Sequence, residues 1–396
     1  MGGCLRRTRF SFDSPRLASG SNLLFDTEII SYKADIASPE RFATICAHPR
    51  YRGVDYSMVW CRRLTGPPLC SRIAESNQEN ASPRIRKRAR MKQSYYTSPA
   101  AQRTPAYEGS PVLDVNLILE GGAMRGQFTA GVLDYFMDNG LWCKNVVGTS
   151  AGALNGYNYV AGELGRTCYL NTKYCGDPRY LSMRNFALTG SAIRRDFMFD
   201  EIPNRLEPFN FDAFRNSPMQ LTTVASNLET GEADYHVMKD AHDDRDLLYL
   251  QASASMPLVS KIIEVDGKKL LDGGPCDSVP LLHCILNGVG DKHIVVLTQD
   301  ATYIKSPNKT MPLVHRAYSD YPLFAERMEH RHFEYNRTYR WVRRLHDEGK
   351  IFMIQPPEPV TISSMEKDPG KLLALYEQGY AEAARQWSGL QAYLEK

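Results

Sequence analysis

The segment Val146-Val147-Gly148-Thr149-Ser150-Ala151-Gly152-Ala153 places a serine between two glycines, at the point where an apolar strand gives way to a helical pattern. A serine in such a G-x-S-x-G turn takes strained backbone angles that lift its hydroxyl out of the sheet. Gly148 and Gly152 leave room for the crowded turn and for a substrate. We therefore predict that Ser150 is a catalytic nucleophile.

A second glycine-rich turn lies upstream of this serine. Residues 112–119 form a mostly apolar strand pattern, and a glycine-rich loop follows before another helical pattern begins. Amides at a helix start lack partners and can point at a developing oxyanion, which the helix dipole also favours. A phosphate-binding loop is the alternative, but the glycines fit neither the Walker nor the dinucleotide spacing. The predicted oxyanion hole comprises Gly121, Gly122, Ala123, Met124, Arg125 and Gly126.

A hairpin further along the chain supplies the candidate general base. Residues 262–265 and 268–271 have strand patterns joined by Asp266-Gly267, a two-residue turn, and Asp272-Gly273-Gly274 follows the second strand. Asp-Gly is common in ordinary turns, which is the alternative role for Asp272. Asp272 follows a strand in a chain that also has a candidate nucleophile and a candidate oxyanion loop, which favours the role of general base.

These three elements, in this order, resemble the patatin-like phospholipase family, which carries a glycine-rich oxyanion loop, a G-x-S-x-G serine and a later D-G-G/A aspartate. Residues 121–126 match the family's G-G-G-x-R/K-G loop, except that Ala123 replaces the third glycine. Residues 253–257 and 277–280 resemble the segments that flank the family's aspartate. The resemblance covers roughly residues 112–300.

The resemblance implies a serine acyl hydrolase that cleaves acyl esters of phospholipids or other lipids through a Ser150–Asp272 dyad and a covalent acyl-enzyme. It implies no metal and no organic cofactor, and it makes Arg125 a helper that holds the loop or meets a substrate anion. The alternatives are a thioesterase or lysophospholipase with the same dyad, or a catalytically idle lipid-binding scaffold. A histidine base would have to come from His283, His293 or His315, none of which has a matching context.

Strand patterns alternate with helical patterns along this region, which predicts an α/β fold. We expect a three-layer sandwich with a mainly parallel central sheet and with the nucleophile at the carboxyl ends of its strands. Residues 167–215 are rich in aromatic residues and methionine, and form an acyl-chain pocket, a lid or ordinary core. The other expected elements are helices at 127–141, 154–165, 247–254, 327–337 and from 372 onward, and strands at 219–226 and 350–357.

Charge and composition divide the chain into three parts. Residues 1–90 carry 16 Lys and Arg against 8 Asp and Glu and lack apolar periodicity. We therefore interpret residues 1–110 as a basic, disordered extension, in which Met91 offers an alternative start. Residues 111–305 form the predicted catalytic domain and 306–396 a C-terminal helical extension. The basic run at 84–90 is a solvated segment or an anionic-lipid contact, with nuclear targeting or nucleic-acid binding as the alternative. We favour the solvated segment and expect no nucleic-acid partner.

The sequence favours a cytoplasmic protein whose contact with a membrane is peripheral. No apolar run approaches the roughly 18–20 residues that span a bilayer, and no secretory h-region follows the first arginines. The nine cysteines form no C-x-x-C pair and are odd in number, which favours reduced thiols. A metal site from Cys46, His48, Cys61 and Cys70 would need irregular ligand spacing.

Overall fold

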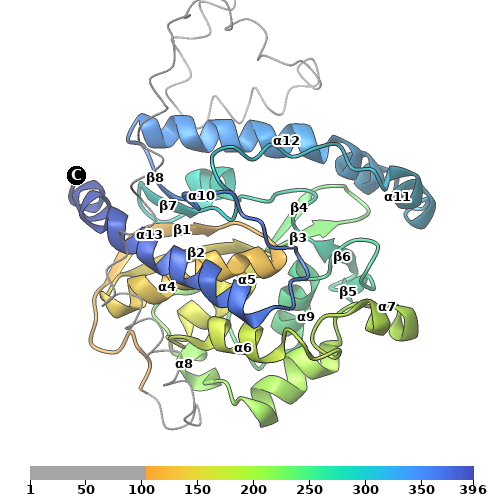
Figure 1. The fold of residues 1–396 in the computed structure, drawn as a ribbon, viewed down its shortest axis with the longest axis horizontal. Coiled ribbons are helices and arrows are strands. Elements are labelled where there is room, and N and C mark those ends of the chain that lie inside the picture. The colour runs from red at the N-terminus through yellow and green to blue at the C-terminus, as the bar shows by residue number, and fades with distance from the viewer. Residues whose placement is uncertain (1–103) are drawn as a thin grey trace, which may run out of the picture. The chain divides into compact units, whose positions relative to one another are not determined.

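The computed structural model describes residues 104–396, in which a mixed sheet lies between two layers of helices (Figure 1). Residues 1–103 lie outside the described residues. They hold most of the predicted basic segment, including Met91 and the run at 84–90. Residues 104–110, the end of the predicted extension, pack onto the sheet domain. The Tyr107 hydroxyl donates to the Ala213 carbonyl at 2.6 Å, and its ring meets Trp142 edge-on.

The described residues contain an eight-stranded sheet, ordered β5-β6-β3-β2-β1-β7-β8, with β4 also paired to β3. Strands β3, β2, β1, β7 and β8 run parallel, whereas β4 and β6 run antiparallel to β3. The strands are β1 (Val112–Leu119), β2 (Trp142–Thr149), β3 (Gln220–Asn227), β4 (Ala233–Met238), β5 (Ile263–Val265), β6 (Lys268–Asp272), β7 (Lys292–Val296) and β8 (Phe352–Ile354). This confirms the predicted α/β sandwich, and β8 confirms the strand predicted at 350–357. Strand β4 was not predicted.

Helices cover both faces of the sheet (Figure 1). They are η4 (Ala123–Gly126), α4 (Gln127–Asp138), α5 (Ala151–Val160), α6 (Arg166–Tyr174), α7 (Met183–Thr189), η5 (Phe197–Leu206), α8 (Phe211–Arg215), α9 (Asp244–Ser253), α10 (Leu281–Asn287), α11 (Met311–Ala317), α12 (Pro322–Asp347) and α13 (Pro369–Glu395). Among them η4 is a single 3₁₀ turn and η5 is a π-helix. Helices α4, α5 and α13 lie on one side of the sheet, and α10 and α12 on the other.

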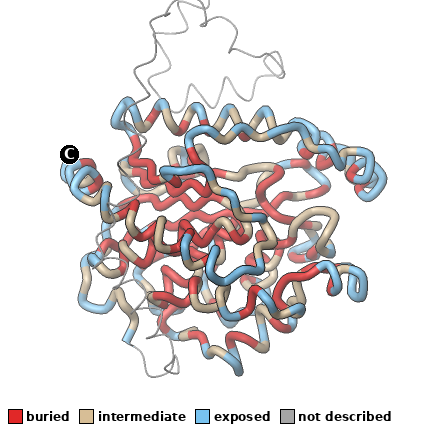
Figure 2. The backbone as a smooth tube through the Cα atoms, viewed as in Figure 1, coloured by how far each residue is buried: buried red, intermediate tan, exposed pale blue. Residues whose placement is uncertain are grey.

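The central strands are apolar on both faces, which explains why two helical layers are needed. Leu117 and Leu119 pack into the core on the α4 side, whereas Ile118 packs into the core on the α12 side. In β2, Val146 packs into the core on the α4 side and Val147 into the core on the α12 side. Because strand side chains alternate between faces, each face buries its own apolar row. Figure 2 shows that the central strands are buried along most of their length.

The predicted C-terminal extension forms part of the same core. Helix α13 packs closely against α4, since a Cβ on Gly131 would lie 2.1 Å from the Tyr376 carbonyl oxygen, and one on Gly379 would lie 2.0 Å from that of Phe128. Helix α12 covers the opposite face through Tyr335, Tyr339 and Val342, among others. Removal of residues 306–396 would therefore expose both faces of the sheet.

Helix α5 ends earlier than predicted. We expected helix over 154–165, but the structure ends it at Val160. Gly162 has a φ of 66°, in the left-handed region, and the Glu163 amide donates to the Asn158 carbonyl. This glycine terminates the helix because it takes a conformation that costs other residues free energy.

Candidate active site

Ser150 occupies the sharp turn between β2 and α5. Its backbone angles are φ 56° and ψ −120°, in a region that residues with a side chain rarely adopt. Such a conformation costs about 1–3 kcal/mol, which the surrounding structure must offset. The strain lifts the hydroxyl to the carboxyl edge of the parallel strands, as the sequence motif predicted.

The glycines beside Ser150 are required by close backbone contacts. A Cβ on Gly148 would lie 2.5 Å from the Gly152 carbonyl carbon, and one on Gly152 would lie 2.3 Å from the Leu119 carbonyl oxygen. Downstream, a Cβ on Gly273 would lie 2.4 Å from the Val224 carbonyl oxygen. The turn therefore packs against β1 at a distance that only glycine permits.

The Ser150 hydroxyl donates a hydrogen bond to Asp272, the last residue of β6. Ser150 Oγ lies 2.5 Å from Asp272 Oδ2, and the Gly274 amide donates to Oδ1 at 2.8 Å. Both side chains are buried, with Ser150 8% and Asp272 6% exposed. Burial raises the pKa of Asp272, while the hydrogen bonds from Ser150 and Gly274 and the charge of Arg331 oppose the rise. A carboxylate with a raised pKa is a stronger base for the serine proton.

Polar side chains from β3 and α9 hold the two candidate catalytic residues in place. Ser253 Oγ accepts from the Ser150 amide at 2.9 Å and donates to the Val224 carbonyl at 2.6 Å. Ser226 Oγ donates to the Asp272 carbonyl, and the Asp272 amide donates to the Ser255 carbonyl. Ser253 and Ser255 belong to the segment that the sequence analysis placed before the aspartate.

The glycine-rich loop offers fewer free amides than we predicted. The amides of Gly121, Met124 and Arg125 donate to the carbonyls of Ser278, Ser364 and Gly122, so none of the three is available to an oxyanion. Within residues 104–396, the amides of Gly122 and Ala123 have no such acceptor, nor has that of Ala151 at the start of α5. Of the residues predicted for an oxyanion hole, Gly122 and Ala123 therefore keep amides without an acceptor, and Ala151 offers a third such amide. Gly126 instead packs against α5, since its Cβ would lie 2.9 Å from that of Ala151.

Ala123 takes a left-handed conformation, with a φ of 49°. It stands where the resemblance would place a third glycine. Glycine takes this conformation without steric cost, whereas alanine does not, so Ala123 adds backbone strain to the loop. A Cβ on Gly122 would lie 2.7 Å from Thr298 Oγ1, so the loop is confined from the β7 side as well.

Glu120, the residue before the glycine loop, is held by four hydrogen bonds. Its carboxylate accepts from the Tyr335 and Tyr339 hydroxyls of α12, each at 2.5 Å, and from the Thr298 amide and hydroxyl at 2.5 and 3.0 Å. Glu120 is 1% exposed. Three of these donors meet Oε2 and one meets Oε1, so both carboxylate oxygens have hydrogen-bond partners. This network was not predicted, because its only local signal in the sequence is an acidic residue at the end of an apolar strand.

An apolar cavity opens beside Ser150. It encloses about 1080 Å³ of empty space, including its open mouth, and Ser150 and Ala151 lie in its wall. Other lining residues come from the loop, α5, η5 and α9, including Met124, Leu154, Met198, Ile202 and Leu250. Residues predicted as an acyl pocket or lid at 167–215 therefore form one wall of a cavity at the serine.

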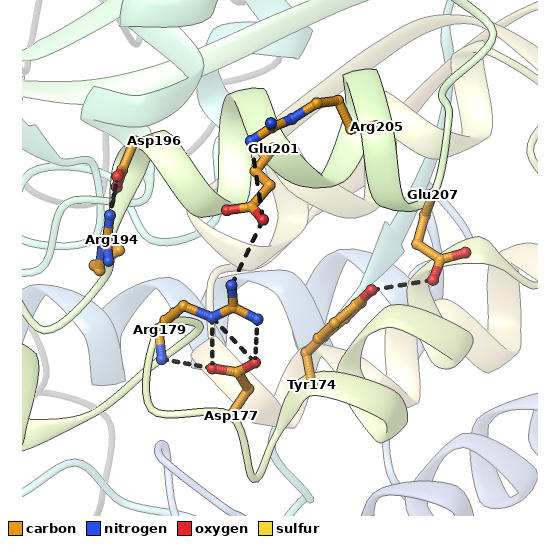
Figure 3. Close-up of polar contacts among 8 residues, drawn as sticks. All are labelled: Tyr174, Asp177, Arg179, Arg194, Asp196, Glu201, Arg205 and Glu207. Atoms are coloured by element: carbon orange, nitrogen blue, oxygen red, sulfur yellow. Dashed lines mark hydrogen bonds and ion pairs between the residues drawn. The ribbon is translucent and has the colours of Figure 1, made fainter.

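The outer surface of that wall carries a series of ion pairs (Figure 3). Arg179 pairs with Asp177 at 2.9 Å and with Glu201 at 3.5 Å, and Tyr174 donates to Glu207 at 3.0 Å. Exposed pairs of this kind contribute little to stability, about 0–1 kcal/mol each. The inner surface is apolar, and a cluster that includes Phe197 and Ile202 packs against Met124 and Leu372. Apolar packing, more than charge, holds the wall against the glycine loop.

The three histidines considered as alternative bases lie elsewhere in the described structure. His293 begins β7, at the end of the strand opposite to the serine, and burial lowers its pKa to about 4. His283 stacks on Tyr235, and His315 of α11 lies 3.7 Å from Glu329 of α12. The hydrogen-bond partner of Ser150 Oγ is Asp272.

Residues 104–396 contain no group of three or more His, Cys, Asp or Glu side chains arranged to hold a metal ion. The predicted alternative of Cys46, His48, Cys61 and Cys70 lies outside the described residues. Within the same range, no helix has the length and apolar character to span a membrane.

The raised pKa of Asp272 predicts the acid limb of the pH profile. The carboxylate must be ionised to accept the serine proton, so ester hydrolysis is expected to rise with pH through its pKa. The pH at which kcat/KM reaches half of its plateau should then lie above 3.8, the ordinary pKa of an aspartate carboxyl. Ester hydrolysis measured from acid to neutral pH checks this. A midpoint at or below that value would contradict the role of burial.

Two family models match this chain. Residues 117–285 match the model described as patatin-like phospholipase, and residues 321–395 match one described as a domain of unknown function, DUF6363. The first range includes the end of β1, the glycine loop, Ser150 and Asp272. The second includes α12, β8 and α13.

Proteins of similar sequence align with part of this chain. The uncharacterized protein YjjU of Escherichia coli K12 is 23% identical over 261 residues, which are 62% of this chain and 69% of that protein. The uncharacterized NTE family protein Mb1092c of Mycobacterium bovis is 28% identical over 185 residues, which are 46% of this chain and 48% of its own. The chain thus spans about half the length of the mycobacterial relative. Among solved structures, VipD from Legionella pneumophila aligns with a TM-score of 0.35 and 13% identity, over 69% of this chain and 67% of that chain.

Proposed function

Since residues 117–285 place this chain in the patatin-like phospholipase family, we propose that it hydrolyses acyl esters of lipids through a Ser150–Asp272 dyad. The family supports lipid acyl hydrolysis as the class of reaction. The observation that carries the dyad is the 2.5 Å hydrogen bond between Ser150 Oγ and Asp272 Oδ2, at the wall of an apolar cavity.

In the first half of the reaction, Ser150 Oγ attacks the ester carbonyl carbon and its proton passes to Asp272 Oδ2. The carbonyl oxygen becomes an oxyanion, which the free amides of Gly122, Ala123 and Ala151 stabilise. Because these amides are fixed by the loop and by α5, they need little reorganisation as the charge develops. Asp272 then returns the proton to the leaving alcohol, and the acyl group remains bound to Ser150.

The second half regenerates the enzyme with water. Asp272 takes a proton from a water molecule, whose oxygen attacks the acyl carbonyl. The same amides bind the second oxyanion. As the carbon–oxygen bond to Ser150 breaks, the proton returns to Ser150 Oγ and the fatty acid leaves. One carboxylate thus serves both halves, and no histidine is needed.

The cavity supports a long acyl chain as the substrate's apolar part. Its lining is dominated by Leu, Ile, Met and Phe side chains, and burial of each methylene contributes about 0.8 kcal/mol. A peripheral encounter with a membrane would bring such a chain to the open mouth. A thioester or a lysophospholipid fits the same chemistry, so both belong among the substrates to be tested.

Reaction with a fluorophosphonate probe tests the nucleophile directly. We expect the wild-type chain to be labelled at Ser150, and Ser150→Ala to lose the label. Hydrolysis of acyl esters by the unlabelled protein, and its loss after labelling, distinguishes an enzyme from an idle scaffold. A folded wild-type chain that neither reacts with the probe nor hydrolyses any ester would overturn the proposed function.

Filling the cavity is expected to shorten the preferred acyl chain. Leu154→Trp adds a bulky ring beside Ser150, so the chain-length optimum in a series of acyl esters should shift by two or more carbons toward shorter chains, since about 0.8 kcal/mol is lost with each excluded methylene. Leu188→Trp on α7, where Leu188 is 73% exposed, serves as the control and should leave the profile unchanged. An unchanged optimum in Leu154→Trp would show that the acyl chain binds elsewhere.

A further inference from the structure

Three cationic side chains from separate segments approach one another beside the candidate active site. Arg125 belongs to η4 in the glycine loop, Lys305 to the segment between β7 and α11, and Arg331 to α12. Lys305 Nζ lies 4.5 Å from the centroid of the Tyr335 ring, whose hydroxyl donates to Glu120. Burial, together with the charges of Arg331 and Arg125, lowers the pKa of Lys305 to about 7, and Glu120 opposes this effect. Tyr335 follows Arg331 by one turn of α12, so Lys305 and Arg331 lie at the same face of that helix.

Arg331 lies next to the candidate base. The position that a Cβ of Gly274 would take lies 2.6 Å from an Arg331 Nη and 3.0 Å from Asp272 Oδ1. The guanidinium and the carboxylate thus flank Gly274. Because glycine leaves this space open, Arg331 can approach Asp272 closely enough to lower its pKa against the effect of burial.

The nearby carboxylates do not neutralise these cations by direct contact. The carboxylate of Glu120 accepts from tyrosine and threonine donors, and that of Asp272 accepts from Ser150 and Gly274. Over residues 104–396, no carboxylate lies within ion-pair distance of the three cations, and the buried Nε atoms of both arginines have no hydrogen-bond partner. Leaving such groups unpaired costs free energy that a bound anion would recover.

The cations and the apolar cavity lie on different sides of the glycine loop. Met124 and Gly126 line the cavity, but Arg125 between them does not, so its side chain leaves the loop in another direction. Ser150 lies in the cavity wall, and its partner Asp272 lies beside Arg331. An ester bound at Ser150 would therefore have an apolar space for its acyl chain and a cationic one for its leaving group.

We propose that Lys305 and Arg331, together with Arg125, bind the phosphate of a glycerophospholipid substrate while its acyl chain occupies the cavity. This inference rests on the proposed function. An arginine guanidinium presents paired donors that match phosphate oxygens, and a lysine adds a point charge. Arg331 lies in the range that matches a domain of unknown function, so headgroup recognition becomes a role for that part of the chain.

The test compares an octanoyl ester of glycerol with the same ester bearing a phosphate on the glycerol. We expect Lys305→Gln and Arg331→Gln each to lower the ratio of the two kcat/KM values, phosphate ester over neutral ester, by about tenfold or more, mainly through KM. The ratio cancels any effect on chemistry that both esters share. Arg340→Gln, an exposed change of the same kind on α12, is the control and should keep the wild-type ratio. Equal ratios in all four proteins would overturn the proposal.

A binding measurement separates this inference from the proposed function. Calorimetry with glycerol phosphate on Ser150→Ala, with and without Lys305→Gln or Arg331→Gln, should show affinity weakened about tenfold or more by either second change. If the wild-type chain hydrolyses neither ester, the proposed function fails, while the calorimetry still decides the anion site. Absent or unaltered binding overturns the inference. Binding of inorganic phosphate as tight as that of glycerol phosphate, without preference between the esters, would assign the site to free phosphate and overturn headgroup recognition.

Discussion

Replacement of Asp272 with Asn is expected to lower kcat/KM for acyl esters by about 10⁴-fold, a loss of the size that removal of a catalytic carboxylate function can cause. The amide keeps the volume of the side chain and can still accept from the Gly274 amide, but it cannot take the Ser150 proton. Ester hydrolysis by the purified variant, compared with wild type and Ser150→Ala, measures the effect.

Controls on folding and on the choice of base accompany this variant. Burial raises the pKa of Asp272 in the folded chain, so above that pKa its ionised form is less favourable there than in the unfolded chain. Removal of the charge should therefore not lower the free energy of unfolding at neutral pH. His293→Ala is expected to retain hydrolysis, because His293 lies at the far end of β7. Loss of activity in His293→Ala but not in Asp272→Asn would contradict the dyad.

Glu120→Ala is expected to lower the free energy of unfolding by about 3–5 kcal/mol. The change removes the acceptor of four buried hydrogen bonds, and each donor left unpaired costs about 1–3 kcal/mol before the structure relaxes. The glycine loop follows Glu120 directly, so kcat should fall as well. Denaturant unfolding and ester hydrolysis measure the two effects.

A matched series shows whether the loss comes from this network. Tyr335→Phe and Tyr339→Phe each remove one donor and should cost about 1 kcal/mol. Glu334→Ala, which removes the partner of Arg337 at the surface of α12, should change the free energy of unfolding by less than about 0.5 kcal/mol. A loss below about 1 kcal/mol for Glu120→Ala would mean that other contacts hold the loop.

The fold was predictable to the extent that each element carried its own local pattern. Strand β1 begins and ends where its apolar run does, and the Asp266-Gly267 turn has φ values of 52° and 72° at its two central residues, as a tight hairpin requires. Strand β4 was missed because its residues are mostly half-buried and lack an apolar run. The length of α5 was misjudged because its helical pattern continues past Gly162, whose left-handed conformation ends it.

The candidate site was likewise predictable only where its features depend on residues that are close together in the sequence. The turn that holds Ser150 and the hairpin that precedes Asp272 were predictable because each stands in a short motif whose glycines meet local steric demands, while the catalytic roles of the two residues stay predictions. Which amides of the glycine loop are already hydrogen-bonded was not predictable from the sequence. The acceptors of the Gly121 and Met124 amides are the carbonyls of Ser278 and Ser364, which lie far along the chain. The contribution of α12 was also missed, since Tyr335 lies 215 residues from Glu120.

By itself, the sequence determined the strained serine turn, the aspartate after a hairpin and the two-sided apolar strands, because backbone sterics and side-chain periodicity act over a few residues. Only the tertiary structure decided which amides remain free, what holds Glu120, and that Arg331 lies beside Asp272. Those outcomes depend on how α12 and the strands pack across one core, and long-range packing leaves no pattern in the local order of residues.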